Sequence, residues 1–417
     1  MIFMRPDSYL KLITKKVFFW PTSPAVTRAV WEPIWRWAGR KAPGKEIRFS
    51  ELRRVLVIRL DEIGDLVLMS PFLRELRRNL PEAWITLVVK PGVFNLVEKC
   101  PYVHEVLTYD WTAGKYTAAY TRQWRALKLA REHLWPRQFD LAILPRWDVD
   151  SYHGTILAYF SGARWRLGFS EKVSPWKEKA NKGFDRLLTH ILDACAPKHE
   201  LLRNLDVLRY LGCEISDEGL EVWLTEKDKA DAVRLLDAHG SRGQGPLMGL
   251  GPGAFIGGKR WPLARFVEVA SWVQNNYGAS IIVVGGQEDE AAGRELQAAL
   301  GGGVINLAGK TTLRQTAAVL SHCRLYIGND SGPMHLAAAA NVPVIEICRF
   351  PRRGNPWHQQ SPRRFGPWGA PSRILQPERA LAPCTEGCEA AEAHCILGVS
   401  VDQVQDAVKD LLSPDYS

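Results

Sequence analysis

Three turns of this sequence gather residues that could do chemistry, and the first of them is acidic. Residues 61–65 read Asp-Glu-Ile-Gly-Asp, with apolar residues at helical spacing directly after them. Gly64 leaves room for a ligand at the turn, and Asp65 begins the helix, where the helix dipole keeps a carboxylate ionised. Such a carboxylate caps its helix, removes a proton from a hydroxyl group, or does both. Asp65 is therefore the candidate general base, and we interpret its rivals Asp61 and Glu62 as solvated loop charges.

The second turn is rich in glycine and carries two adjacent cations. Residues 251–262 read Gly-Pro-Gly-Ala-Phe-Ile-Gly-Gly-Lys-Arg-Trp-Pro and lead into a further helical pattern. Glycines such as Gly253 let backbone amides approach a phosphate, while Lys259 and Arg260 supply positive charge. A glycine-rich turn alone is a weak signal, but its combination with cations and a helix start indicates a phosphate site.

The third turn, residues 328–336, reads Gly-Asn-Asp-Ser-Gly-Pro-Met-His-Leu and also precedes a helix. Backbone amides at Ser331 and Gly332 are free to bind an anion at the helix N-terminus, and Asp330 can recognise a hydroxyl group. The alternative is a tight capped turn, with His335 as a core histidine whose hydrogen bonds are satisfied. The turn by itself leaves both interpretations open.

These turns follow apolar runs that alternate with helical patterns, in two series along the chain. Such runs are typical of a mainly parallel sheet with helices on both faces. Ligands bind outside the carboxyl ends of such strands, which is where the three turns lie. The sequence thus predicts an α/β fold of two domains facing each other across a cleft, with strands over residues 54–60, 84–89, 104–108 and 141–144, a strand-like run at 220–224, and strands over 247–250, 280–284, 304–306 and 325–327.

We place the hinge between the two domains near residue 240, in a Gly- and Ser-rich stretch. This division gives a basic, aromatic N-terminal extension over residues 1–50, a first domain over residues 51–240 and a second over residues 241–417. The last helix, residues 401–412, is amphipathic, and we expect it to return to the first domain.

The composition of the 417 residues, 46% apolar and 24% charged, is typical of a globular protein. No apolar stretch reaches the ~20 residues of a membrane-spanning helix, and lysines interrupt the N-terminus, so we expect a cytoplasmic protein. The net charge of +9 arises mainly in residues 1–50, which hold ten Lys and Arg against three acidic residues. Because the remainder is nearly neutral, a nucleic-acid partner is not expected.

The N-terminal extension interleaves basic and aromatic residues over positions 8–37. That pattern is typical of a segment lying on an anionic membrane, here the inner face of the cytoplasmic membrane. The alternative is an arm packed on the body of the protein, and Pro33 interrupts any long helix. The aromatic residues concerned are Phe18, Phe19, Trp20, Trp31, Trp35 and Trp37.

Taken together, the three turns resemble those of glycosyltransferase family 9, whose best known members are the ADP-heptose:lipopolysaccharide heptosyltransferases. The resemblance spans roughly residues 54–346, with the motifs in the family's order and at about its spacing. The matching stretches are Val55-Leu56-Val57-Ile58-Arg59 running to Gly64-Asp65 and Pro71, then Pro252-Gly253 with Lys259-Arg260-Trp261-Pro262, and finally Gly328-Asn329-Asp330-Ser331-Gly332-Pro333-Met334-His335-Leu336-Ala337.

The resemblance implies a GT-B fold, in which two Rossmann-like domains bind an acceptor mainly through the N-terminal half and a nucleotide sugar mainly through the C-terminal half. It implies that Asp65 is the catalytic base and that Lys259 contacts the donor phosphates. Glu288, in Gly285-Gly286-Gln287-Glu288, looks like the family's nucleoside-binding acid. Further donor contacts that the third turn implies are Asp330, Ser331, Gly332 and His335.

The activity implied by the resemblance is an inverting transfer of a sugar, with heptose from ADP-heptose as the first candidate, to a lipopolysaccharide core or related envelope glycolipid. Asp65 would remove the acceptor proton while Lys259 and the helix starts stabilise the departing diphosphate. No metal and no cofactor are expected. Asp148-Val149-Asp150 imitates a metal-binding Asp-x-Asp motif, but it is better interpreted as a helix cap. The alternatives are transfer from another nucleotide sugar and a noncatalytic nucleotide-sugar-binding protein.

An arginine-rich segment departs from the family pattern. Arg349-Phe350-Pro351-Arg352-Arg353 replaces the family's Gly-Pro-Thr turn, and Arg363 and Arg364 follow it. The segment either meets a phosphorylated lipid acceptor or is a solvated basic loop.

Most of the eight cysteines are scattered singly, as expected for buried thiols in a reducing compartment. Cys384, Cys388 and Cys395, with His394, offer soft metal ligands. Their spacing lacks a Cys-x-x-Cys pair, however, and ligation by the adjacent His394 and Cys395 would be cramped. We therefore expect packed thiols or one local bridge there.

Overall fold

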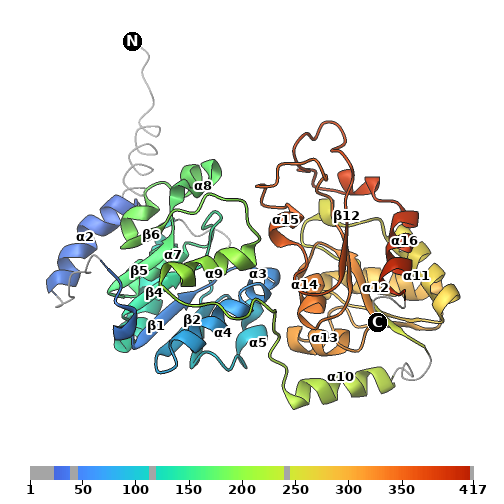
Figure 1. The fold of residues 1–417 in the computed structure, drawn as a ribbon, viewed down its shortest axis with the longest axis horizontal. Helices are drawn as coiled ribbons and strands as arrows, with labels where there is room; N and C mark the ends of the chain where they lie inside the picture. Colours follow the sequence, from blue (N-terminus) through green and yellow to red (C-terminus); the bar gives the residue numbers. More distant parts are fainter. Residues whose placement is uncertain (1–22, 38–45, 112–118, 239–244, 414–417) are drawn as a thin grey trace, which may run out of the picture.

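The structure is a computed structural model that describes residues 23–37, 46–111, 119–238 and 245–413. Figure 1 shows two α/β halves side by side. In the described residues of the first half, six parallel strands form one sheet in the order β3-β2-β1-β4-β5-β6. The strands are β1 (Arg54–Ile58), β2 (Trp84–Val89), β3 (Glu105–Thr108), β4 (Leu141–Leu144), β5 (Trp165–Phe169) and β6 (His190–Leu192).

Helices cover both faces of this sheet, and alternate residues of β1 therefore pack in two different hydrophobic cores. Val55 and Val57 pack in one hydrophobic cluster, whereas Leu56 and Ile58 pack in another. Strands buried on both faces require near-continuous apolar sequence, which is what the run in β1 provides. The helices of this half are α2 (Pro24–Trp37), α3 (Ile63–Val67), α4 (Ser70–Asn79), α5 (Phe94–Val97), α6 (Ala119–Leu129), α7 (Gly154–Phe160), α8 (Pro175–Ala180) and α9 (Glu200–Tyr210).

The helical pattern after Asp65 is interrupted once, between α3 and α4. The break comes just before Pro71, whose nitrogen has no hydrogen to donate to the preceding turn. Instead, the Ser70 hydroxyl donates to the Val67 carbonyl oxygen at 2.7 Å. The short helix α3 is thereby held at the carboxyl end of β1.

The second half repeats the topology of the first, with described strands in the order β12-β11-β10-β7-β8-β9. In each half the first and fourth strands are therefore neighbours at the centre of the sheet. The strands are β7 (Leu247–Gly251), β8 (Ser280–Val283), β9 (Val304–Asn306), β10 (Leu325–Asn329), β11 (Val344–Ile347) and β12 (Ser372–Leu375). The helices are α10 (Glu226–Ala238), α11 (Leu263–Tyr277), α12 (Glu290–Leu300), α13 (Leu313–Leu320), α14 (Gly332–Ala339), α15 (Pro362–Phe365) and α16 (Val401–Leu411).

The strands expected in the two series are confirmed as β1 to β4 and β7 to β10. The prediction of a strand at 220–224 is wrong. Its apolar residues pack against the main core, but the Glu221 amide donates to the Ser70 hydroxyl at 2.9 Å and not to a neighbouring strand. The last helix does not return to the first half, because α16 packs against α11 and β12 and its apolar face joins their core.

The two halves share one hydrophobic cluster. It joins Leu66 and Val67 of α3 with Met334 and Leu336 of α14, and α13 lies against both α5 and α10. Figure 1 shows α3 and α14 facing each other where the halves meet. The hinge near residue 240 remains a prediction, and α10, which precedes it, already packs on α13 of the second half.

The described part of the N-terminal extension packs on the first half. In α2, Trp31 makes an edge contact with Phe160 at 5.5 Å between ring centroids, and Tyr159 donates to Glu32 at 3.3 Å. Phe18, Phe19 and Trp20 lie outside the described residues, as do the side chains of Trp35 and Trp37. None of the helices in the described ranges combines the length and the apolar composition that a membrane-spanning helix requires.

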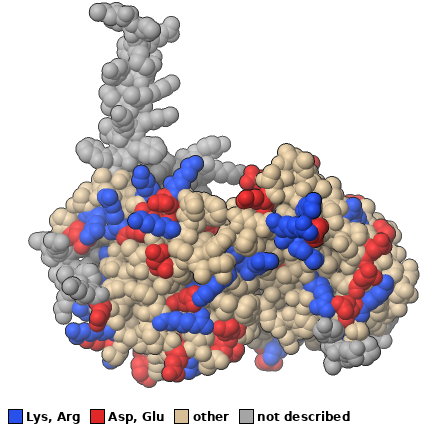
Figure 2. Space-filling model, turned by 45° about the horizontal axis from the view of Figure 1, so that its top comes forward, with Lys and Arg blue, Asp and Glu red and all other residues tan. Residues whose placement is uncertain are grey.

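The charged side chains on the face drawn in Figure 2 are of both signs. Lys and Arg lie interspersed with Asp and Glu over both halves, and neither sign covers the face. This distribution agrees with the small net charge of the sequence after residue 50.

Candidate active site

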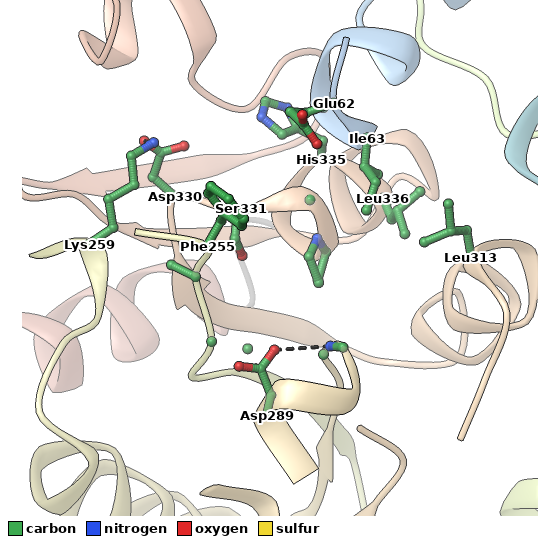
Figure 3. A pocket seen from close by; sticks show the side chains of 18 of the residues that line it. Glu62, Ile63, Phe255, Lys259, Asp289, Leu313, Asp330, Ser331, His335 and Leu336 are labelled. Atoms are coloured by element: carbon green, nitrogen blue, oxygen red, sulfur yellow. Dashed lines mark hydrogen bonds and ion pairs between the residues drawn. The ribbon is translucent and has the colours of Figure 1, made fainter. Parts of the chain in front are cut away.

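The carboxyl ends of β1, β4, β7 and β10 open into one cavity of 670 Å³ between the halves. Small-molecule sites have volumes of about 300–1,000 Å³ and lie at the point where the strand order of an open α/β sheet reverses. Figure 3 shows side chains that line this cavity. Of the residues proposed from sequence, it is lined by Gly64, Asp65, Gly253, Lys259, Glu288, Asp330, Ser331, Gly332 and His335, but not by Arg260.

Asp65 is held between two arginines. Its Oδ1 accepts a hydrogen bond from Arg59 Nη2 at 2.8 Å and lies 3.9 Å from Arg146 Nη1, while its Oδ2 accepts from the Glu62 amide at 3.3 Å. Burial raises the pKa of the Asp65 carboxyl, but the charges of Arg59 and Arg146 outweigh burial, so the net pKa lies below its ordinary value. Asp65 therefore caps its helix and is an ionised proton acceptor as well.

The sequence did not identify Arg59 and Arg146 as site residues. Arg59 directly follows β1, which was a usable signal, and its side chain is buried between Asp65 and Asp61. Arg146 follows β4 and reaches the site only because β4 neighbours β1 in the sheet. These two guanidinium groups set the charge state of the candidate base.

The interpretation of Asp61 as a solvated loop charge is wrong. Asp61 is buried, with its Oδ2 2.6 Å from Arg59 Nε and its Oδ1 paired with Arg146. Glu62 is exposed, but it accepts a hydrogen bond from Tyr152 at 2.9 Å and pairs with Lys90. Both carboxylates therefore already form ion pairs with cationic side chains of the first half.

Two glycines let α3 and α14 approach each other across the cavity. A Cβ atom at Gly64 would lie 2.7 Å from Nε2 of His335, and one at Gly332 would lie 2.9 Å from Cδ1 of Ile63. Real Cβ atoms essentially never come so close, so each glycine is required by a side chain from the other half. The contact places Asp65 beside the turn that carries Ser331.

The third turn keeps two buried polar atoms without a partner in the described structure, Ser331 Oγ and His335 Nδ1. Burial lowers the pKa of His335 to about 4, so its ring is neutral at pH 7. Buried polar atoms of this kind carry a free-energy cost unless a ligand or water bonds to them. The interpretation of His335 as a core histidine with satisfied hydrogen bonds does not fit this arrangement.

Lys259 Nζ forms an ion pair with Asp330 Oδ2 at 2.6 Å, and Figure 3 shows the two side chains pointing toward each other. Burial lowers the pKa of Lys259, but the Asp330 charge outweighs burial and raises it overall, so the ammonium stays charged. Asn329 ties the second and third turns together, donating to the Pro252 carbonyl at 2.7 Å and accepting from the Trp261 amide at 3.1 Å.

Arg260 does not line the cavity, and its Nε donates to the Ala254 carbonyl at 2.8 Å. It therefore shapes the second turn. Gly253 packs directly on the Asp289 carboxylate, which accepts from the Gly286 amide at 3.0 Å. Glu288, one residue earlier, is exposed at the mouth of the same region.

Both carboxylates of the Asp-x-Asp sequence in the first half bond to other groups of the protein. Asp150 accepts from the Gly154 and Thr155 amides at 2.9 and 2.8 Å, which confirms its role as a cap, here of α7. Asp148 pairs with Arg364 at 3.0 Å.

The arginine-rich segment is partly buried, so the solvated-loop interpretation is wrong for two of its residues. Arg364 bridges Asp148 and Glu200 and stabilises the contact between the halves. Arg349 is also buried and donates to Gln360 and Ala390. Neither guanidinium group is exposed to meet an acceptor.

Comparison with known proteins identifies heptosyltransferases among the similar chains. The sequence is 26% identical over 302 residues to lipooligosaccharide heptosyltransferase 2 of Haemophilus influenzae, covering 70% of this chain and 82% of that protein. It is 25% identical over 378 residues to lipopolysaccharide heptosyltransferase 2 of Salmonella typhimurium, covering 87% and 99%.

Two solved structures share the fold. A family 9 glycosyl transferase from Veillonella parvula superposes with a TM-score of 0.72 at 23% identity, covering 89% of this chain and 99% of that one. The Escherichia coli ADP-heptose LPS heptosyltransferase II superposes with a TM-score of 0.63 at 21% identity, covering 87% and 100%. The expected GT-B fold is confirmed.

The family itself follows from the sequence match. Residues 127–393, more than half of the chain, match glycosyltransferase family 9 (heptosyltransferase). This range contains the second and third turns, whose residues line the cavity together with Asp65. The chain therefore belongs to glycosyltransferase family 9, and it is a glycosyltransferase.

Proposed function

We propose that the protein transfers heptose from ADP-heptose to the core of a lipopolysaccharide or related envelope glycolipid, with inversion at the anomeric carbon. The observation that carries the proposal is the meeting of an ionised carboxylate from one half with a lysine and a helix N-terminus from the other in one cavity. The similar heptosyltransferases support the choice of donor and acceptor.

In the proposed reaction, Asp65 takes the proton of the acceptor hydroxyl as its oxygen attacks the anomeric carbon. The bond from that carbon to the diphosphate oxygen breaks, and the electron pair leaves with the diphosphate. Arg59 and Arg146 keep Asp65 ionised before the reaction. The negative charge of a bound diphosphate would raise the pKa of Asp65 and make it a stronger base when the donor is present.

Lys259 and the first amides of α14 are proposed to stabilise the departing diphosphate. The Lys259 ammonium lies at the cavity wall, where it is paired with Asp330, so phosphate oxygens can share it. Ser331 Oγ and His335 Nδ1 would then find hydrogen-bond partners on the donor. Glu288, at the mouth of the cavity, is the proposed contact of the nucleoside.

The proposed transfer needs no metal ion, because Lys259 and the helix N-terminus already lie where negative charge develops. We expect turnover to be the same with and without added Mg²⁺ or Mn²⁺. A loss of turnover in chelator that either of these ions restores would contradict this part of the proposal.

We also propose that the protein works at the anionic inner face of the cytoplasmic membrane, where a glycolipid acceptor would lie. The test is a variant that lacks residues 1–22. The deletion stops there because α2 packs on the first half and should be kept. Loss of their basic and aromatic residues should reduce recovery with anionic vesicles but not with neutral ones. Equal recovery of both forms would contradict membrane binding by this segment.

The transfer is tested by incubating the protein with a set of nucleotide sugars and truncated lipopolysaccharide and analysing products by mass spectrometry. ADP-heptose should give a product one heptose heavier and should raise the melting temperature most among the donors. Product from a different nucleotide sugar would show that this other sugar nucleotide, and not ADP-heptose, is the donor. Donor binding by wild type, with no product from any acceptor, would contradict the proposed reaction.

A further inference from the structure

Four soft ligand atoms lie together in the second half, away from the cavity. They are Sγ of Cys384, Cys388 and Cys395 and a ring nitrogen of His394, and all lie within 4.8 Å of one another. The three thiols are free, and the cavity lining contains none of the four residues. Three thiolates and one imidazole form a common ligand set of structural zinc sites.

The distances within this cluster fit tetrahedral coordination. Metal–sulfur and metal–nitrogen bonds of zinc place neighbouring sulfur and nitrogen ligands about 3.6 Å apart. The Nδ1 atom of His394 lies 3.7 Å from Sγ of Cys384 and 3.4 Å from Sγ of Cys395. The adjacent residues His394 and Cys395 thus direct their ligand atoms to the same region, which removes the objection that their ligation would be cramped.

The segment that carries the cluster has little other structure to hold it. Residues 376–394, all of them described, contain no helix and no strand, and such long irregular segments are uncommon in compact domains. Within it Cys388 is fully buried, as is Cys395 at its end, whereas Cys384 and His394 are partly buried. A closed site with four protein ligands is typical of a metal that holds structure and leaves no position for substrate.

The same segment packs against the turn that carries Lys259. A Cβ at Gly258 would collide with the Ala390 carbonyl oxygen, and one at Gly257 would lie 2.6 Å from the Ala391 carbonyl oxygen. Arg349 Nη1 donates to that Ala390 carbonyl at 2.8 Å. The backbone between Cys388 and His394 therefore supports the two glycines directly before Lys259.

We propose that Cys384, Cys388, His394 and Cys395 bind one divalent transition-metal ion in tetrahedral coordination, zinc or ferrous iron. Binding releases the thiol protons to solvent and leaves three thiolates and a neutral imidazole on the ion. The ion fixes residues 384–395 against Gly257 and Gly258. It is a structural ion, separate from the cavity, and its presence does not depend on the proposed transfer reaction. By supporting these two glycines the ion would also position Lys259 for donor binding, and this consequence rests on the proposed function.

The first test is the metal content of the full chain, purified without a tag or chelator and measured by plasma mass spectrometry. We expect one equivalent of zinc or iron per chain, lost in Cys384→Ser and Cys388→Ser and kept in Cys195→Ser, the matched control with an exposed thiol outside the cluster. The element identifies the ion. Protein that stays metal-free after incubation with zinc or ferrous salts, that forms a disulfide within the cluster, or that keeps its metal in both cluster variants would overturn the proposal.

The second test avoids variants that fail to fold. Wild type stripped by a chelator should melt about 5 °C or more below the metal-bound protein and recover when zinc is returned, and cobalt in its place should give the absorption of a tetrahedral thiolate site. If the ion positions Lys259, donor affinity should fall when the metal is removed and recover when the metal is returned. Unchanged melting and no cobalt–thiolate absorption would refute the site, whereas absence of heptosyl transfer would leave the metal result standing.

Discussion

The two halves of the molecule have the same strand order but place different chemistry at the same point of that order. After β1 and β4, arginines and carboxylates form a neutralised network around Asp65. After β7 and β10, glycines, one Lys–Asp pair and unpartnered polar atoms face the cavity. The topology therefore determines where ligands lie, whereas the turn residues determine whether a half handles a proton or a phosphate.

The sharpest test of this division is removal of the proton acceptor. Asp65→Asn keeps the shape of the side chain but loses the base, so turnover should fall about 100-fold or more. Donor affinity, measured by calorimetry, should stay close to that of wild type because the second half is unchanged. Glu62→Gln, which removes the same charge three residues away, is the control. Near-normal turnover of Asp65→Asn would exclude Asp65 as the base.

A change on the phosphate side should affect binding as well as rate. Lys259→Ala removes a charge that meets the donor in both the ground and transition states, so donor affinity should fall about tenfold and turnover should fall with it. Arg260→Ala is the matched control, since Arg260 does not line the cavity. Equal losses of affinity in the two variants would contradict the assignment of Lys259.

The contact between the halves can be broken and repaired. Gly64→Ala places a methyl group against His335, and overpacking of this kind costs about 1–3 kcal/mol of stability. His335→Ala in the same chain should restore much of the melting temperature, although donor binding should not recover. A double variant no more stable than Gly64→Ala would show that the clash is not the cause.

The smallest expected effect concerns pH. Because the pKa of His335 falls from an ordinary value of 6.5 to about 4 on folding, the unfolded chain binds more protons between these values, and stability decreases as pH falls through this window. Between pH 7 and 5.5 this should remove about 1 kcal/mol, measured by urea unfolding. His335→Gln should lose less over the same interval. Parallel losses in both proteins would mean that His335 titrates normally.

Sequence patterns gave the positions of the turns and most of the strands, because apolar runs and glycine turns are local properties. Arg146 could not be assigned, since it meets Asp61 only through the pairing of β1 with β4. Arg364 looked like a surface charge because its partners Asp148 and Glu200 lie far away in sequence. The proximity of the ligand atoms of Cys384, Cys388, His394 and Cys395 could not be predicted for a similar reason, because spacing along the chain does not report distance in space.

The reciprocal fit of Gly64 to His335 and of Gly332 to Ile63 has a consequence for protein engineering. Each glycine is matched to a side chain encoded in the other half of the gene. A chimaera that joined the first half of this protein to the second half of a relative would have to inherit both matches together. Exchange of halves to change the donor should therefore begin with residues 63–64 and 332–335, treated as one unit of inheritance.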